Sequence, residues 1–271
     1  MPFEAINYIQ GDTEKVAFGR GTFAARSSMV GGNALRVAAD AVIARGKEMA
    51  GVLMEAAPND IEFKAGSYTV MGTDKRMSIS DVARAFFAPA GPVLKFGLGL
   101  DGVGSYAGVP GGAPNYPNGC QVCEVEVDPE TGAVRIDRFA AVDDLGMIIN
   151  PMIVEGQIHG GIAQGVGQAL FENIVYDEQS GQLITGSFLD YGMPRADDFP
   201  SFASELVEIP AKTNPLGIKG IAESGTIGAP PTVVNAVLDA LSSRGVEHLD
   251  MPLTPARIWQ AANAPAKIAR S

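Results

Sequence analysis

The chain has 271 residues, 46% hydrophobic and 19% charged, a composition typical of a globular protein rather than a disordered one. Its formal charge of −11 argues against nucleic acid or an anionic membrane as a partner, because both attract basic patches. Two cysteines cannot build a disulfide framework and favour a reducing compartment, so we expect a cytoplasmic protein. No apolar run in the sequence is long enough to span a bilayer.

The first part of the chain predicts short strands around one long helix. Apolar residues at helical spacing between residues 35 and 54 indicate an amphipathic helix. The Gly- and Pro-rich stretch over residues 101–119 indicates a long loop or a boundary between lobes. The other expected elements are a strand over 3–9, a hairpin centred on Gly66, and a helix over 82–87 capped by Ser80 and Asp81.

The second part has a clearer pattern. Alternating residues on both sides of a Pro129–Gly132 turn predict a β-hairpin over 122–139. Further elements are expected as follows: a helix over 153–171 after the break at Asn150-Pro151, a hairpin around Ser180-Gly181, a strand over 205–210, a helix after Pro231, and a helix over 255–262. We therefore predict an α+β fold with mixed sheets and packed helices in two lobes, 1–115 and 116–271.

Five glycines interrupt the predicted helix over 153–171, and each costs about 1 kcal/mol of helix stability relative to alanine. Such a cost favours close approach of another backbone or of a flat cofactor to this helix. The spacing Gly-x-x-x-Gly also occurs in membrane dimers, but polar side chains, among them Gln157 and Gln164, exclude that interpretation. Tight helix packing and cofactor binding both remain open, and the two glutamines offer donors and acceptors to a ligand rich in heteroatoms.

The segment from Gly217 to Pro231 isolates one carboxylate, Glu223, among four glycines and mostly apolar neighbours. It reads as a tight loop that leads into a helix N-terminus. A carboxylate in a poorly solvated pocket has a raised pKa and suits general-base catalysis. The alternative is a structural glutamate that only accepts hydrogen bonds from the loop.

Other candidate sites are weaker. Cys120 and Cys123 have Cys-x-x-Cys spacing, but they lie in a predicted strand, where residues three apart point to opposite faces. Two histidines in the whole chain cannot form a histidine-rich metal site. Asp143 and Asp144 are either paired carboxylates or an ordinary strand-end turn.

Three groups of segments together resemble the molybdenum-binding subunit of the xanthine dehydrogenase / aldehyde oxidase family. In chain order they are Gly11–Thr13 with Gly21–Ser27, Val142–Pro151 running into Gly156–Gly165, and Lys219–Gly225 with Pro230–Ala236. Their order and spacing match the C-terminal part of that subunit over nearly the whole chain.

The resemblance implies molybdenum held by a molybdopterin, as the cytosine dinucleotide, with no metal ligand from the protein. Glu223 matches the family's general base, which takes a proton from a Mo–OH group during oxidative hydroxylation of an N-heterocycle, purine or aldehyde. Gln157 matches a glutamine that hydrogen-bonds near the molybdenum oxo group and the pterin. Ala24, Ala25 and Ser27 match a cofactor-contacting loop, in which many relatives have serine at the position of Ala25.

The family's subunit is far longer than this chain, and its upstream part carries another cofactor loop and most substrate-selecting residues. The resemblance therefore implies a C-terminal portion that is inactive alone. Its expected partners are the missing N-terminal part of the subunit, iron–sulfur and FAD subunits, and a small-molecule substrate. The alternative is a non-catalytic folding or interaction module without a complete cofactor site.

Overall fold

The computed structural model describes residues 1, 3–16, 18–19, 21–87, 91–108 and 115–264. The chain divides into two compact units, Met1–Pro110 and Gly111–Ser271, each of which is described by itself. The expected lobe boundary, 115/116, falls five residues from this division. None of the helices in the described ranges is long and apolar enough to cross a membrane.

The first unit packs one long helix against a small antiparallel sheet. Its helices are α1 (Gly32–Met54) and α2 (Ile79–Phe87), and its strands are β1 (Ile61–Lys64), β2 (Ser67–Val70) and β3 (Arg76–Ser78) in the order β1-β2-β3. Short 3-10 turns cover Phe3–Ala5, Pro58–Asp60 and Gly91–Phe96, and a π-helical turn covers Ser27–Gly31. The core forms where Met49 of α1, Tyr68 of β2 and Phe86 of α2 meet, all fully buried.

Three elements predicted for this unit are confirmed, and two details are wrong. The long helix, the hairpin around Gly66 and a short helix that ends at Phe87 are present. The strand over 3–9 is absent, because the only regular structure there is the Phe3–Ala5 turn, which has no neighbouring strand to pair with. The cap of α2 is Ser78 rather than Ser80: the Ser78 Oγ accepts a hydrogen bond from the Asp81 N–H at 3.1 Å.

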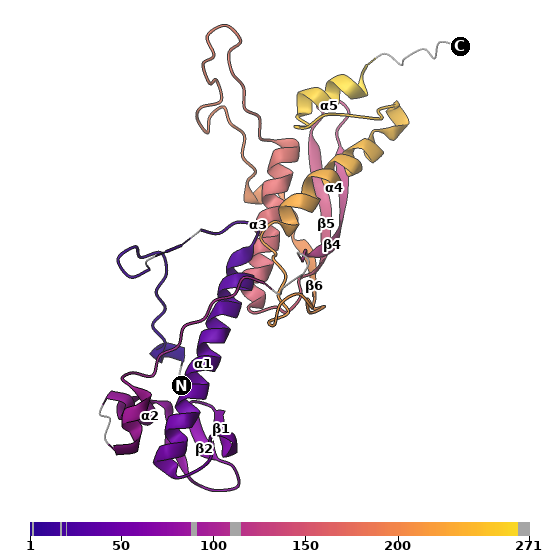
Figure 1. Cartoon of the computed structure of the whole chain (residues 1–271). Coiled ribbons are helices and arrows are strands. Elements are labelled where there is room, and N and C mark those ends of the chain that lie inside the picture. The colour runs from indigo at the N-terminus through magenta and orange to yellow at the C-terminus, as the bar shows by residue number, and fades with distance from the viewer. Residues whose placement is uncertain (2, 17, 20, 88–90, 109–114, 265–271) are drawn as a thin grey trace. The chain divides into compact units, whose positions relative to one another are not determined.

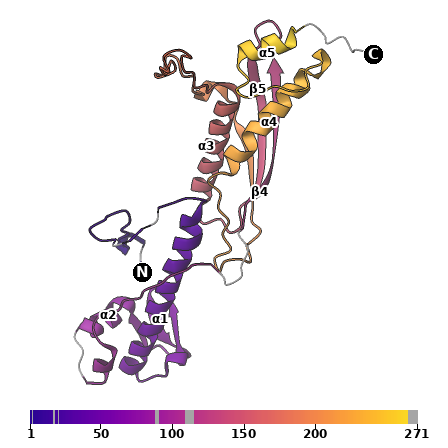
Figure 2. The same ribbon diagram turned by 45° about the horizontal axis from the view of Figure 1, so that its top comes forward.

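The second unit places helices against a mixed three-stranded sheet. Its strands are β4 (Asn118–Val127), β5 (Val134–Asp144) and β6 (Phe202–Val207), in which β4 pairs with β5 antiparallel and β6 pairs with β5 parallel. Its helices are α3 (Pro151–Leu170), α4 (Ser224–Ala240) and α5 (Pro255–Ala262). Both views show α3 and α4 side by side, with α4 along the β4–β5 hairpin (Figures 1 and 2). The mixed sheets and packed helices of the predicted α+β fold are confirmed.

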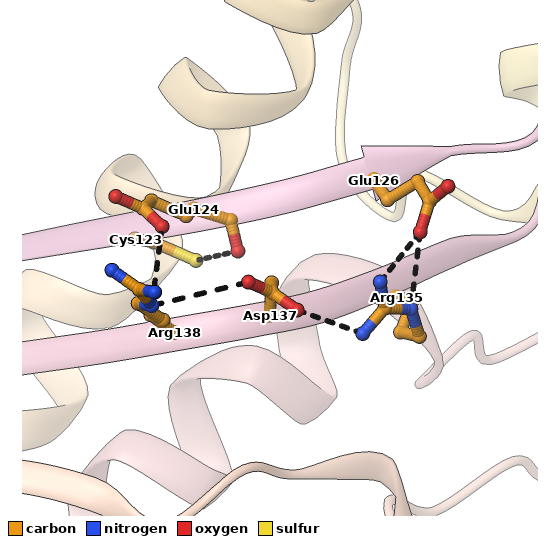
Figure 3. Close-up of polar contacts among 6 residues, drawn as sticks. All are labelled: Cys123, Glu124, Glu126, Arg135, Asp137 and Arg138. Carbon is orange, nitrogen blue, oxygen red and sulfur yellow. Dashed lines mark hydrogen bonds and ion pairs between the residues drawn. The ribbon is translucent and has the colours of Figure 1, made fainter.

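The outer face of the β4–β5 hairpin carries alternating charges (Figure 3). Arg135 reaches both Glu126 at 2.6 Å and Asp137 at 2.8 Å, and Arg138 lies 3.7 Å from Glu124. These groups are exposed, so each pair contributes little to stability. Cys123 directly precedes Glu124 but is half-buried, and desolvation with the nearby Glu124 charge raises its pKa to about 11. Its thiol is therefore protonated at neutral pH.

The elements of this unit depart from prediction mainly at their boundaries. Asn150 and Pro151 do not merely break the chain but start α3: the Asn150 Oδ1 accepts the Ile153 N–H at 3.2 Å, and proline takes the first helical position. The predicted strand over 205–210 lies at Phe202–Val207. The hairpin around Ser180-Gly181 has only a single bridge, from Tyr176 to Leu183.

The helix expected after Pro231 begins earlier, at Ser224, and contains both prolines. A proline inside a helix lacks the N–H that would bond four residues back, so it normally marks a helix start. Here the Thr232 Oγ1 donates to the Gly228 carbonyl at 2.8 Å beside the two prolines. Glu223 is consequently the residue that directly precedes α4.

Close backbone contact between α3 and α4 explains part of the glycine pattern. A Cβ at Gly161 would lie 2.9 Å from the Thr226 nitrogen, and one at Gly165 would lie 2.8 Å from the Ala229 Cβ. From the other side, a Cβ at Gly225 would lie 2.5 Å from the Ile158 carbonyl oxygen. Three glycines therefore allow the middle of α3 to touch the first turns of α4, as the tight-packing interpretation predicts.

We expect Gly161→Ala to destabilise the chain and Gly160→Ala to stabilise it. A methyl group at 161 meets backbone atoms that cannot move aside, and such overpacking costs about 1–3 kcal/mol. At the neighbouring Gly160 a Cβ has open space, so only the helix-propensity gain of about 1 kcal/mol applies. Denaturant unfolding of both variants checks this, and equal effects of the two substitutions would contradict the packing.

Candidate functional site

Glu223 lies at the N-terminus of α4 with its side chain exposed. Its carbonyl accepts the Ile227 N–H at 2.9 Å, as the first hydrogen bond of the helix, but its carboxylate has no hydrogen bond or ion pair among the described residues. The partial positive charge of a helix N-terminus favours an anion at this place. The described residues do not enclose the side chain, so the poorly solvated pocket expected around it is not formed by them.

The loop before Glu223 is bonded to the chain that follows β5. Gly146 and Ile218 form an isolated antiparallel bridge, in which the Met147 N–H donates to the Gly217 carbonyl at 2.9 Å and the Lys219 N–H donates to the Leu145 carbonyl at 3.2 Å. Gly146 has a φ of 66°, and a Cβ there would lie 2.4 Å from the Gly217 oxygen. Glycine at 146 is thus required for this bridge.

An ion pair between Asp144 and Lys219 strengthens the same connection. Their side chains are only 14% and 10% exposed, and the Lys219 Nζ donates to the Asp144 Oδ2. The Asp144 Oδ1 also accepts the backbone N–H groups of Gly146 and Ile209, at 3.1 and 3.2 Å. Desolvation alone would raise the pKa of Asp144, but these hydrogen bonds and the lysine charge together hold it below its ordinary value.

The same segment carries a second charged side chain, Glu223, four residues after Lys219. Asp144 binds the ammonium group of Lys219, and the Glu223 carboxylate has no ion pair among the described residues. A carboxylate without an ion-pair partner is able to accept a proton, as a general base must.

The other side of Glu223 is anchored to α3. The Thr226 Oγ1 donates to the Gly161 carbonyl at 3.1 Å, and Gly225 contacts the backbone of Ile158 and Ile162. Glu223 is therefore held between the Lys219–Asp144 pair before it and the α3 contact after it.

The outward face of α3 offers an accessible backbone beside two glutamines. At Gly156 and Gly160 a Cβ would meet nothing within 4 Å, and Gln157 and Gln164 are exposed. Internal packing does not explain these two glycines, whereas a flat group that approaches the helix would. These residues thus fit a planar cofactor rich in heteroatoms. Gln157 lies one residue before Ile158, which touches the start of α4, but its sharing of one cavity with Glu223 stays a prediction.

Ala24, Ala25 and Ser27 belong to the first unit: Ala24 and Ala25 lie in the turn that precedes the π-helical segment, and Ser27 is its first residue. Ala24 and Ala25 have φ values of 49° and 50°, a left-handed conformation that is uncommon for alanine and costs about 1–2 kcal/mol per residue. Ser27 is exposed, and its Oγ lies 2.5 Å from the Thr22 Oγ1. Two successive strained residues next to a π-helical turn are typical of a functional loop.

The sequence interpretation missed the different environments of Asp143 and Asp144. Successive residues of a strand point to opposite faces, so two adjacent strand residues cannot form a catalytic pair. The sequence already contained this signal. Asp144 points to Lys219, while Asp143 is 3% exposed, and burial raises its pKa. The role of Lys219 had no sequence signal, because its partner is distant in the chain.

We expect Lys219→Met to destabilise the second unit by about 3–5 kcal/mol at pH 7, because it leaves the charge of Asp144 mostly buried without its counter-ion. Denaturant unfolding measures the loss, and Lys212→Met, at an exposed position of the same loop, is the matched control. The penalty should shrink as the pH falls through the lowered pKa of Asp144, since a protonated carboxyl needs no counter-ion. Equal stability of the two variants at pH 7 would show that the ion pair does not hold the loop.

Comparison with known proteins places these features in a family. The sequence profile described as a molybdopterin cofactor-binding domain matches residues 1–200. That range includes the Ala24–Ser27 turn and Gln157, while Glu223 lies beyond it.

Individual relatives match along almost the whole chain. The carbon monoxide dehydrogenase large chain of Hydrogenophaga pseudoflava is 36% identical, and the nicotine 6-hydroxylase large subunit of Paenarthrobacter nicotinovorans is 39% identical; each match covers 96% of this chain and 32% of the relative. The solved structure of quinoline 2-oxidoreductase from Pseudomonas putida 86 superposes with a TM-score of 0.80 at 39% identity, over 91% of this chain and 31% of that one. The chain spans about a third of the length of the curated relatives it matches.

Proposed function

Because this chain belongs to the molybdopterin cofactor-binding family and aligns with part of the large subunit of molybdenum hydroxylases, we propose that it supplies the catalytic base of such an enzyme. The observation that carries the proposal is the anchored, exposed and unpaired carboxylate of Glu223, beside a helix whose outward face leaves its backbone accessible. Gln157 of the second unit is a proposed cofactor contact, and the Ala24–Ser27 turn of the first unit is another.

When bound, the molybdenum cofactor supplies the two-electron oxidation of the substrate. Glu223 acts as the general base, whose carboxylate accepts the proton of the attacking oxygen nucleophile. Gln157 would donate a hydrogen bond to the cofactor and so orient it, and the Ala24–Ala25 backbone and the Ser27 hydroxyl would contact it. The exposed face around Gly156 and Gly160 lets the cofactor approach the helix backbone.

The proposed reaction is oxidative hydroxylation at an electron-poor carbon of an N-heterocycle, a purine or an aldehyde. Two relatives are named for nicotine and quinoline, which supports the first of these classes. The relatives are also named as large chains or large subunits, which supports partner subunits that carry the iron–sulfur and FAD groups. We further infer the cytosine dinucleotide form of the cofactor.

In the complete enzyme we expect Glu223→Gln to slow reduction by substrate by about 10²–10⁴-fold, because glutamine keeps the shape of the side chain but cannot accept the proton. Rapid-reaction absorbance measures this half-reaction, and metal analysis should find the same molybdenum content as in the wild type.

Gln157→Ala should lower cofactor retention or turnover more mildly than Glu223→Gln lowers the rate, since Gln157 orients the cofactor and does not take the proton. Glu178→Gln, at an exposed position in the loop after α3, is the matched control. A near-normal rate for Glu223→Gln in a fully loaded enzyme would exclude Glu223 as the base.

The isolated 271-residue chain should retain little or no molybdenum and show no hydroxylase activity. The described residues leave Glu223 and the outward face of α3 exposed, so the cofactor would lack one wall of its site. Elemental analysis of the purified chain checks this. Stoichiometric molybdenum would mean that the chain forms a complete cofactor site by itself.

A further inference from the structure

A cavity of about 370 Å³ lies between the start of β4, the end of β5 and the first turns of α4. Its size is at the lower end of the range for small-molecule sites. Gln121, Asp143 and Ser224 contribute polar groups, and Ile227 and Pro231 contribute apolar walls. None of these residues has a role in the proposed hydroxylation.

Buried polar atoms without partners are concentrated on residues that line this cavity. Of the four such side-chain atoms among the described residues, three belong to its lining residues: the Gln121 Oε1, the Asp143 Oδ2 and the Ser224 Oγ. Each unpaired buried polar atom costs about 1–3 kcal/mol, and most buried polar groups in folded proteins are hydrogen-bonded. Three such atoms on the residues around one cavity therefore indicate a ligand that supplies the missing hydrogen bonds.

The chemistry of these atoms defines the ligand. The Gln121 Nε2 donates to the carbonyls of Ser224 and Gly225, at 3.3 and 3.5 Å, so the side-chain oxygen is the atom left without a partner. Asp143 is 97% buried and has no cationic partner among the described residues, and desolvation raises its pKa. The atoms without partners on its lining residues are thus two acceptors, which require hydrogen-bond donors, and one hydroxyl, which can accept or donate.

Two glycines maintain the space around the polar groups. A Cβ at Gly119 would lie 2.4 Å from the Asp143 Oδ1, and a Cβ at Gly228 would lie 2.6 Å from the Gln121 Cδ. Any larger residue at either position would displace a polar side chain or fill the cavity.

We propose that this cavity binds a cationic nitrogen group, a guanidinium or a primary ammonium, with Asp143 as its counter-ion. No lysine or arginine is present among the described residues that line it, so the positive charge has to come from the ligand. A metal ion fits less well, because the described part of the chain contains no group of three His, Cys, Asp or Glu side chains placed to hold one. Planar guanidinium groups and ammonium groups are the donors that pair with buried carboxylates.

The test uses methylguanidinium as the probe and the 271-residue chain as the protein. Nuclear magnetic resonance should show saturable shifts of the Gln121 side-chain amide and of the Gly119 and Gly228 backbone amides. Tetramethylammonium, which has the charge but no N–H donor, should cause none. Asp143→Asn keeps the shape but removes the charge and should weaken binding about tenfold or more, as expected for a lost charge-assisted hydrogen bond. Asp239→Asn, at an exposed position on α4, should bind as the wild type does.

Absence of saturable shifts, equal shifts with tetramethylammonium, or unchanged affinity in Asp143→Asn would each overturn the proposal. Gly228→Ala provides a second variant in case Asp143→Asn does not fold: its methyl group occupies the space beside Gln121 and should abolish binding. Methylguanidinium affinity retained in a folded Gly228→Ala chain would overturn the proposal as well.

A second arm identifies the source of the cation, and this arm alone rests on the proposed function. If the probe also binds the complete large subunit, the natural ligand is a free small cation. If it binds the 271-residue chain but not the complete subunit, an arginine or lysine side chain of the remaining polypeptide fills the cavity. The first arm does not depend on molybdenum or on catalysis, so its failure would leave the hydroxylase proposal unaffected.

Discussion

The backbone contact between α3 and α4 is the constraint on which the rest of the second unit depends. Gly161 and Gly225 face one another at a separation that no side chain could occupy, so the two helices meet through their main chains. Helices usually pack through side chains at axial distances of about 8–10 Å, and small residues bring them closer. This approach brings the first turn of α4 against α3, and Glu223 directly precedes that turn.

The end of β5 adds the second constraint through two adjacent carboxylates in unlike environments. Asp144 is surrounded by donors, so it is stable as an anion and fixes the segment around Lys219. Asp143, one residue earlier, points to the opposite face and has no donor among the described residues. Because strand geometry separates the two side chains, the same dipeptide serves a structural connection on one face and a polar cavity on the other.

The sequence predicted those parts of the fold in which local pattern and tertiary structure agree. The long helix α1, the β4–β5 hairpin and α5 have strong periodicity or clear turn and cap residues, and they form as expected. The start of α4 did not follow from local rules, because Pro230 and Pro231 indicate a helix start and only packing against α3 extends the helix back to Ser224. The candidate site shows the same division. Glu223 and Gln157 stand out in the sequence by their glycine-rich surroundings. The Lys219–Asp144 pair joins residues far apart in sequence, so it could be recognised only in the structure.

The parallel pairing of β5 with β6 also has a consequence for the order of folding. Between these strands the chain forms the whole of α3 and a long projecting loop, so the pairing closes a large loop whose entropic cost must be met first (Figure 1). The β4–β5 hairpin needs only a short turn and can form early. The segment that carries Glu223 follows β6, and its anchors lie on β5 and α3. It can therefore reach its native geometry only when β5 and α3 are in place.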